Sequence, residues 1–284
     1  MLTLRNMGQS IRWAFNWKEW NPSKTDFAYA ISCVQLEEKE RLARYVFRKD
    51  IRASLIGRLM MRKFIHEYAH IPYNDIILTR DANSKPILSN GLSNFNFNVS
   101  HQGDYTVLAA ETRNVTLGVD VMKLEYTSGK PLDEFFRIMN RNFSASEWEE
   151  IKHFAPDESE QIGMFCRHWA LKESYVKALG VGITIDLRTI EFRTNSKLAE
   201  NSVTTDTVLY INGVKQDWLF EETLLNSQHC VSVALQENGK APNSQGNTFE
   251  IIDSNKLFAG SVPLHPLDSH YTEKYFEKDE YPSQ

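Results

Sequence analysis

Apolar residues recur every three or four positions between residues 159 and 180, which is the spacing of one helix face. Gly180 directly follows the last periodic residue and predicts the end of this helix. Trp169, Glu173 and Lys177 are each four residues apart, so they share one face of the helix. The spacing therefore places a carboxylate and an ammonium one turn from each other, which is also the pattern of an ordinary surface ion pair.

A second pattern alternates strictly and predicts a strand over residues 116–122. Leu117, Val119 and Val121 lie on one side of this strand, whereas Gly118, Asp120 and Met122 face the other way. An aspartate inside a strand is disfavoured by intrinsic propensity. Asp120 is therefore interpreted either as a residue at a solvated strand end or as a ligand.

Alternating residues also predict a hairpin between residues 95 and 111. Its first strand ends near Ser100 and His101, the turn contains Gln102-Gly103-Asp104, and the second strand begins at Tyr105. Ser100 and His101 are thus expected at the mouth of the hairpin, where polar groups are accessible to a ligand.

The remaining elements follow from the same periodicities. Residues 36–68 are strongly helical with a break near 48–51, residues 132–140 form a helix, and Ser144 with Glu147 has the spacing of a capping box for another. Residues 25–34 are predicted as a strand, although Asp26 is also compatible with the start of a helix. Further strands are expected at 11–15, 76–80, 189–193, 207–211, 218–222 and 229–235, with a hairpin turn at Asn212-Gly213.

Three motifs in order carry a family resemblance. They are Asn98-Val-Ser-His101, Gly118-Val-Asp120 and Trp169-Ala-Leu-Lys-Glu173-Ser-Tyr-Val-Lys177. In sequence and spacing they resemble the phosphopantetheinyl transferases, and within them the large, single-chain Sfp-like group. The resemblance spans roughly residues 11–236, and the third motif is the most specific.

The resemblance implies an α+β fold of two similar α/β subdomains related by a pseudo-twofold. The corresponding division is an N-terminal subdomain at 1–121 and a C-terminal subdomain at 122–240. Residues 241–284 contain seven acidic residues, three lysines and scattered Pro, Ser and Asn, and are predicted to be an acidic, mostly disordered tail.

The implied activity is transfer of 4′-phosphopantetheine from coenzyme A to a serine of an apo acyl-carrier or peptidyl-carrier domain. Asp120 and Glu173 are the expected magnesium ligands, because Mg²⁺ prefers oxygen donors. Glu173 is also the expected base, and Lys177 the residue that binds phosphates and stabilises the leaving group.

Coenzyme A is expected to contact several polar residues. The resemblance gives this binding set as Arg41, Arg80, Lys85, Asn98, Ser100, His101 and Lys177.

Two positions depart from the family pattern. Ser84 stands where glycine is usual, and Met122 stands where many members have a third acid, a place that water or Gln102 is able to fill. These departures keep two alternatives open: a non-catalytic coenzyme A-binding regulator, and a docking protein for carrier domains.

The composition restricts the class of binding partner and the cellular compartment that we expect. The formal net charge of −5 argues against nucleic acid as the main partner. No apolar run approaches the length of a membrane span, and residues 1–10 lack the apolar core of a secretory signal. Three widely spaced cysteines predict free thiols in the cytosol. The partners implied by the family resemblance, not by composition, are carrier domains of fatty-acid synthases and aminoadipate-pathway enzymes, and a single chain with a pseudo-twofold is expected to be a monomer.

Overall fold

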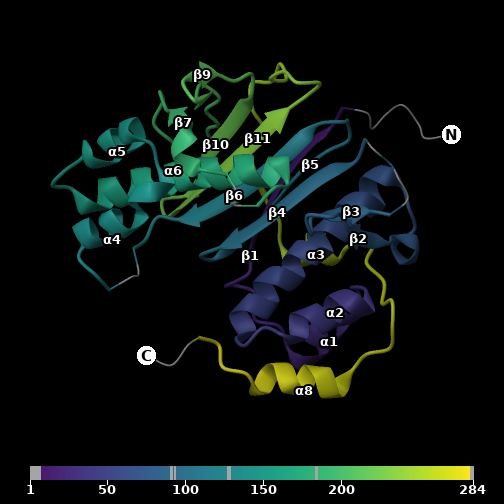
Figure 1. The fold of residues 1–284 in the computed structure, drawn as a ribbon. Coiled ribbons are helices and arrows are strands. Elements are labelled where there is room, and N and C mark those ends of the chain that lie inside the picture. Colours follow the sequence, from purple (N-terminus) through teal and green to yellow (C-terminus); the bar gives the residue numbers. More distant parts are fainter. Residues whose placement is uncertain (1–7, 90–91, 93, 127–128, 183–184, 282–284) are drawn as a thin grey trace. The chain divides into compact units, whose positions relative to one another are not determined.

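The computed structural model describes residues 8–89, 92, 94–126, 129–182 and 185–281. Their helices and sheets confirm the predicted mixed α+β class (Figure 1). The chain divides into two compact units. The first contains residues 1–81, 86–113 and 250–284, and the second contains residues 82–85 and 114–249. The predicted boundary at 121 therefore lies one strand too late, because residues 116–123 pair within the second unit.

The first unit packs helices on a four-stranded sheet with strand order β12-β1-β5-β4. Its core contains Phe27, Leu55, Phe64 and Leu108, all almost fully buried. Its strands are β1 (Ser10–Asn16), β2 (Leu78–Arg80), β3 (Pro86–Leu88), β4 (Asn96–Gln102), β5 (Tyr105–Glu111) and β12 (Glu250–Ile251). Its helices are α1 (Lys24–Ser32), α2 (Leu36–Ala43), α3 (Arg48–Ala69), α7 (Ser254–Phe258) and α8 (Ser269–Glu277).

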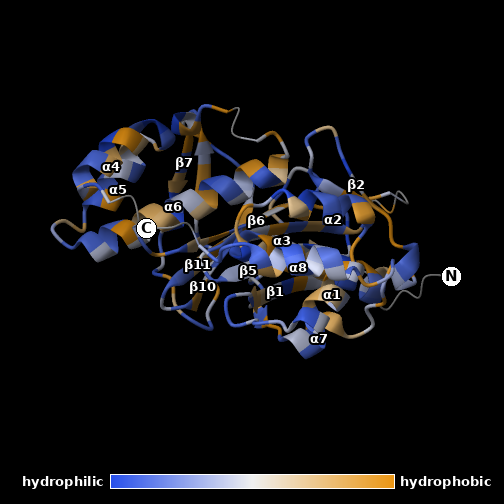
Figure 2. Cartoon of the chain, turned by 90° about the horizontal axis from the view of Figure 1, so that it is seen from below, coloured by the Kyte–Doolittle hydropathy of each residue, from blue (hydrophilic) through white to orange (hydrophobic). Residues whose placement is uncertain are grey.

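The second unit packs helix α6 on a three-stranded sheet with strand order β10-β11-β6. Its strands are β6 (Thr116–Lys123), β7 (Ile190–Arg193), β8 (Val208–Ile211), β9 (Val214–Lys215), β10 (Leu219–Asn226) and β11 (His229–Gln236). Its helices are α4 (Leu132–Met139), α5 (Ala145–Lys152) and α6 (Glu158–Leu179). Helix α4 carries hydrophobic and hydrophilic residues on different faces (Figure 2), and it buries Leu132 and Phe136.

Local sequence signals explain several element ends. Ser144 and Glu147 form the predicted capping box at the start of α5. Gly180 ends α6 in the left-handed region with φ of 69°, as predicted. The helix predicted over 36–68 is split between α2 and α3, and the break lies at residues 44–47, slightly earlier than expected.

The strand predicted at residues 25–34 is wrong, because the segment forms helix α1. The Ser23 side chain accepts a hydrogen bond from the Asp26 backbone N–H, and the Asp26 side chain accepts one from the Ser23 backbone N–H. This reciprocal cap satisfies donors that a helix start leaves unpaired. The buried Phe27 and Ile31 then lie one turn apart on the face toward the core.

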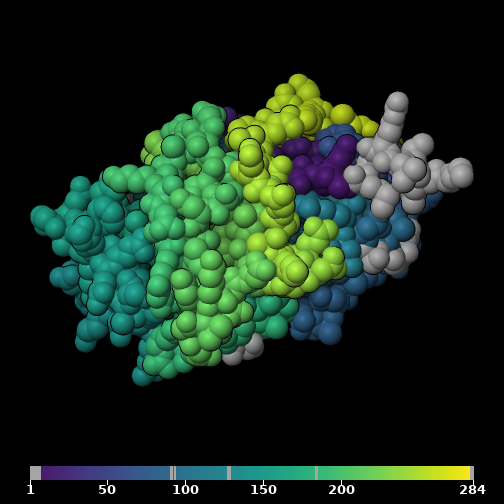
Figure 3. Space-filling view, turned by 90° about the horizontal axis from the view of Figure 1, so that it is seen from above, coloured from purple at the N-terminus to yellow at the C-terminus, as the bar shows by residue number. Residues whose placement is uncertain are grey.

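The prediction that the C-terminal segment is mostly disordered is also wrong for residues 250–281. Strand β12 pairs in parallel with β1, and Tyr275 of α8 stacks on Phe27 with ring centroids 3.7 Å apart. Lys39 and Asp268 add an ion pair of 2.7 Å. Figure 3 shows yellow-green residues of the C-terminal part of the chain on the surface next to purple residues of the N-terminal part. Residues 1–7 and 282–284, also covered by the predictions for the two ends, lie outside the described residues.

Candidate active site

The second unit brings strand β6 and helix α6 into direct contact at Gly118. A Cβ atom at this position would lie 2.1 Å from the Ser174 carbonyl oxygen and 2.4 Å from the Ala178 nitrogen. Only glycine therefore allows the backbones of β6 and α6 to approach so closely. This contact is the structural reason for the glycine two residues before Asp120.

A hydrogen bond between two serines fixes the same contact next to Asp120. Ser232 of β11 is the direct neighbour of Asp120 in the sheet, and its hydroxyl lies 3.1 Å from the Ser174 hydroxyl of α6. Both serines are buried. The helix is thus held against the sheet at the residue that follows Glu173.

Asp120, Glu173 and Lys177 converge where α6 crosses β6. Asp120 is buried, and its Oδ1 atom lies 2.5 Å from the Lys177 Nζ atom. Burial, followed by the nearby Asp120 charge, raises the pKa of the half-buried Glu173 carboxyl, and Lys177 acts against this rise. The two carboxylates therefore repel each other, and one ammonium neutralises them only in part.

Two carboxylates close enough to influence each other's charge suit a divalent cation. The described residues hold no cluster of three or more His, Cys, Asp or Glu side chains arranged for a metal. Magnesium, however, is usually bound through one or two carboxylates together with substrate phosphates. The donor set of Asp120 and Glu173 fits that description, and a cation would relieve the Asp120 repulsion, which adds to the effect of burial in raising the pKa of Glu173.

Met122 faces the apolar interior of the second unit. Its side chain packs against a cluster that includes Phe136, Phe165 and Cys230. The position where many relatives of the resembled family carry a third acid is thus used for packing in this chain. A carboxylate placed in these apolar surroundings would be desolvated.

The first unit contains a cationic pocket of about 510 Å³. Three of the predicted coenzyme A contacts line it, namely Arg41, Arg80 and His101. Its remaining lining residues are Arg44, Tyr45, Ser54, Gly57, Arg58, Met61, Pro86 and Val99. Four arginines around one cavity create a positive potential that favours a polyanionic ligand.

Sequence reasoning missed Arg44 and Arg58. Arg44 follows Arg41 by three residues, so both lie on neighbouring positions at the end of α2. Arg58 is buried in α3, hydrogen-bonds Ser54, and lies 3.6 Å from Glu38 of α2. The spacing of Arg41 and Arg44 was visible in the sequence, but the packing of α2 on α3 that adds Arg58 was not.

The other predicted contacts lie outside this pocket. Asn98 and Ser100 are buried and alternate with Val99 and His101, so they lie on the opposite face of β4. Lys85 donates a hydrogen bond of 3.1 Å to the Leu117 carbonyl in the second unit. Ser84 has φ of 66°, so the conformation that glycine favours is present although the glycine is not.

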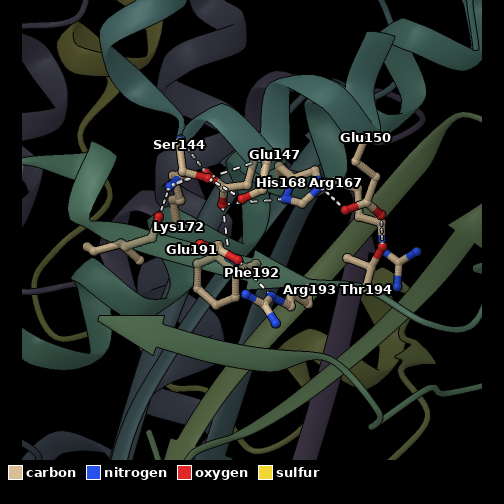
Figure 4. A network of polar contacts seen from close by, with 12 residues as sticks. Ser144, Glu147, Glu150, Arg167, His168, Lys172, Glu191, Phe192, Arg193 and Thr194 are labelled. Carbon is tan, nitrogen blue, oxygen red and sulfur yellow. Dashed lines mark hydrogen bonds and ion pairs between the residues drawn. The ribbon is translucent and has the colours of Figure 1, made fainter. Parts of the chain in front are cut away.

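Helix α5 is connected to α6 by a buried network of charged side chains (Figure 4). Glu147 forms an ion pair of 2.8 Å with Lys172 and accepts a hydrogen bond of 3.0 Å from the Phe192 backbone N–H. Lys172 also donates to the Leu187 and Ile190 carbonyls, so its three protons all have acceptors. The network thus connects α6 to α5 and to the chain around β7 at Lys172, the residue before Glu173.

Both units match models of one family. Residues 18–113 match the 4′-phosphopantetheinyl transferase N-terminal model, and residues 116–234 match the 4′-phosphopantetheinyl transferase superfamily model. L-aminoadipate-semialdehyde dehydrogenase-phosphopantetheinyl transferases are similar along nearly the whole chain. The protein from Xenopus laevis is 39% identical over 96% of this chain and 94% of its own length, and that from Homo sapiens is 40% identical over 96% and 93%.

A bacterial relative is more distant but carries a related name. A 4′-phosphopantetheinyl transferase from Bacillus pumilus is 31% identical over 56% of this chain and 64% of its own length. The matched models cover both units, and the similar vertebrate proteins are aligned almost from end to end. This chain therefore belongs to the 4′-phosphopantetheinyl transferase superfamily and is a transferase of that family.

Proposed function

We propose that this enzyme transfers 4′-phosphopantetheine from coenzyme A to a serine of an apo carrier domain. The observation that carries the proposal is the convergence of Asp120, Glu173 and Lys177 in a chain of this family. The serine oxygen forms a bond to the β-phosphorus, and the bond from that phosphorus to the bridging oxygen breaks. Adenosine 3′,5′-bisphosphate leaves, and the serine proton passes to a base.

Glu173 is the proposed base. Its carboxylate is proposed to accept the serine proton, directly or through a water molecule, as the family resemblance implies. Asp120 and Glu173 are also the proposed magnesium ligands. A bound magnesium ion would neutralise charge on the diphosphate.

Lys177 is proposed to bind the phosphates and to stabilise the leaving group. Its ammonium is already held at 2.5 Å from Asp120, so it is oriented before substrate arrives. Its side chain is 29% exposed, which leaves part of the ammonium accessible. In this arrangement Asp120 positions Lys177 as well as a cation.

The cationic pocket of the first unit is proposed to bind phosphates of coenzyme A. Arg41, Arg80 and His101 support this role because they line one cavity with two further arginines. Lys85, Asn98 and Ser100 are kept as proposed contacts on the strength of the motifs alone. Arg44 and Arg58 join the proposed set on the strength of the pocket.

The proposed carriers are domains of fatty-acid synthases and of aminoadipate-pathway enzymes. The names of the vertebrate relatives support the second group. The family resemblance suggests that the segment before helix α6 receives the carrier. Phe135 and Met139 of α4 are half-buried and are proposed as contacts there, whereas Phe136 is only 2% exposed and packs in the core. A monomer is proposed because both family models match a single chain.

A cytosolic location is proposed from the cysteines, since all three are buried free thiols. No helix in the described part of the chain is both long and apolar enough to span a membrane.

The deciding experiment weighs several apo carriers after incubation with the enzyme, coenzyme A and magnesium. Phosphopantetheine addition is expected, and it should stop with EDTA and return with added magnesium. Glu173→Gln and Asp120→Asn are expected to abolish transfer while keeping the circular dichroism of the parent. Glu160→Gln, an exposed change on the same helix, is the matched control and should remain active.

Other outcomes identify the alternatives. Tight coenzyme A binding without any carrier mass change would favour a non-catalytic regulator. Carrier binding that is independent of both coenzyme A and magnesium would favour a docking protein. Near-normal turnover in both acid variants would remove the proposed metal site.

A further inference from the structure

His168 is a fully buried histidine between two carboxylates, and the proposed chemistry does not use it. Its Nε2 atom lies 3.2 Å from Glu150 Oε2, and its Nδ1 atom lies 3.6 Å from Glu147 Oε1 (Figure 4). Both glutamates belong to α5, where a spacing of three residues places them on one face, whereas His168 belongs to α6. The ring therefore bridges the two helices.

The two contacts define the charge of the ring. A neutral imidazole has one N–H donor and one nitrogen lone pair, whereas an imidazolium has two donors. With a carboxylate facing each nitrogen, the neutral ring would direct a lone pair at a negative charge. Burial alone would lower the pKa of His168, but the carboxylates of Glu147 and Glu150 outweigh it and raise the pKa.

The other charged groups around the ring do not provide both carboxylates with a positive partner. From α6, Lys172 pairs with Glu147, and Arg167 pairs with Glu222 of β10 at 2.8 Å. Thr194, directly after β7, donates to the second oxygen of Glu150, and Glu191 of β7 acts on Lys172. Phe143 covers the ring from the loop before α5. Lys172 thus neutralises Glu147, whereas the charge of Glu150 is balanced first by His168, with the hydrogen bond from Thr194 and the charge of Arg167 adding to it.

We infer that His168 is a positioning residue whose imidazolium joins Glu150 and Glu147 and holds α6 in the rotation that aims Glu173 at Asp120. Its proton links this geometry to pH. When the ring loses the proton it loses its positive charge, and a nitrogen lone pair then faces a carboxylate. At Nδ1, which lies 3.6 Å from Glu147 and makes no hydrogen bond, the contact is purely ionic, so the link between α5 and α6 weakens. This inference rests on the proposed function only where it concerns transfer; the charge of His168 does not depend on it.

The direction of the pH effect follows from the raised pKa. A group whose pKa is higher in the folded state stabilises it fully below its unfolded pKa, about 6.5 for histidine, and loses this effect as pH rises through the folded value. Stability and kcat should therefore fall together on the alkaline side. The KM for coenzyme A should change less than kcat, because the residues of the cationic pocket do not lie on α6, whereas the proposed phosphate contact Lys177 does.

The test uses Glu150→Gln with Glu149→Gln as its matched control. Glu150 is half-buried against His168, whereas Glu149 is exposed on the same helix and loses the same charge. The ring signals of the eight histidines are followed by NMR from pH 5 to 9.5, with His168→Asn to assign the relevant signal. Urea unfolding, kcat and KM are measured over the same range.

In the parent, the His168 ring should titrate above pH 6.5, and kcat should fall with it. Glu150→Gln should lower the ring pKa and move the alkaline fall of kcat by about one unit, because an opposite charge at this range shifts a pKa by about 1–3 units. Glu149→Gln should move neither. A ring pKa at or below the ordinary value would overturn the inference.

Two further results would also overturn it. One is equal displacement of the ring pKa in both glutamine variants, and the other is a displaced ring pKa with an unmoved kcat profile. A parent that transfers nothing at any pH would instead count against the proposed function. In that case, ring titration and unfolding would still decide whether His168 is a charged link between α5 and α6.

Discussion

Gly118→Ala tests whether close approach of two backbones creates the active-site geometry. The added Cβ would lie 2.1 Å from the Ser174 oxygen and 2.4 Å from the Ala178 nitrogen, both of which are backbone atoms. Real Cβ contacts are almost never shorter than 3.0 Å, so α6 has to move by about 0.9 Å or more. Glu173 and Lys177 lie on this turn of α6 and would move with it.

The expected cost has two parts. Overpacking of a well-packed contact costs about 1–3 kcal/mol, and the upper end is expected because no flexible side chain is available to yield. A displacement of about 1 Å at reacting groups lowers the rate by roughly 100-fold. Urea unfolding measures the first effect, and single-turnover carrier mass measurement, which isolates chemistry from product release, measures the second.

Gly163→Ala is the control for this change. Gly163 also belongs to α6, but apart from the backbone of its own helix no atom lies within 4 Å of the place where a Cβ would stand, and its φ is not positive. Alanine there should stabilise the helix by about 0.5–1 kcal/mol and leave transfer unchanged. If Gly118→Ala were as stable and as active as Gly163→Ala, the close-approach explanation of the motif would fail.

Two further predictions concern the first unit. Arg41→Gln should raise the KM for coenzyme A by about 10-fold or more without changing the KM for the carrier, because a hydrogen bond to a charged group contributes about 1.5–3 kcal/mol. Arg188→Gln, at an exposed arginine, is the control. An equal effect of both changes on this KM would refute the proposed phosphate pocket. Tyr275→Ala should lower the unfolding free energy by about 3 kcal/mol, since it removes a buried ring stacked on Phe27. Tyr281→Ala, at a residue 48% exposed, should cost less than about 1 kcal/mol, and similar urea midpoints for the two would show that α8 does not stabilise this unit.

The positions of the motif residues were predictable because each motif depends on short-range rules. Alternation placed Gly118 and Asp120 on one strand face, and a spacing of four placed Glu173 and Lys177 on one helix face. The sequence did not reveal why Gly118 is required, because the steric limit comes from Ser174 and Ala178, more than fifty residues later. The family resemblance predicted that the two motifs contribute to one site. The structure shows that they meet where α6 crosses β6.

The C-terminal segment shows where composition is misleading. Its polar and acidic residues suggested disorder, yet Tyr271 and Tyr275 are four apart and Asp268 caps the helix that carries them. These local signals were present in the sequence. What decided the outcome was a partner far along the chain, Phe27 of α1, against which both tyrosines stack.

Met122 clarifies how a site with two carboxylates is compatible with this fold. Its side chain belongs to an apolar cluster around Phe165 and Phe136, so an acid at 122 would be desolvated without the partner that Asp120 has in Lys177. Residue 122 is therefore used for packing in this chain. Under the proposed function, Asp120 and Glu173 leave more of the magnesium coordination to phosphate oxygens and water. Magnesium affinity would then depend on the bound diphosphate more strongly than in relatives with three acids.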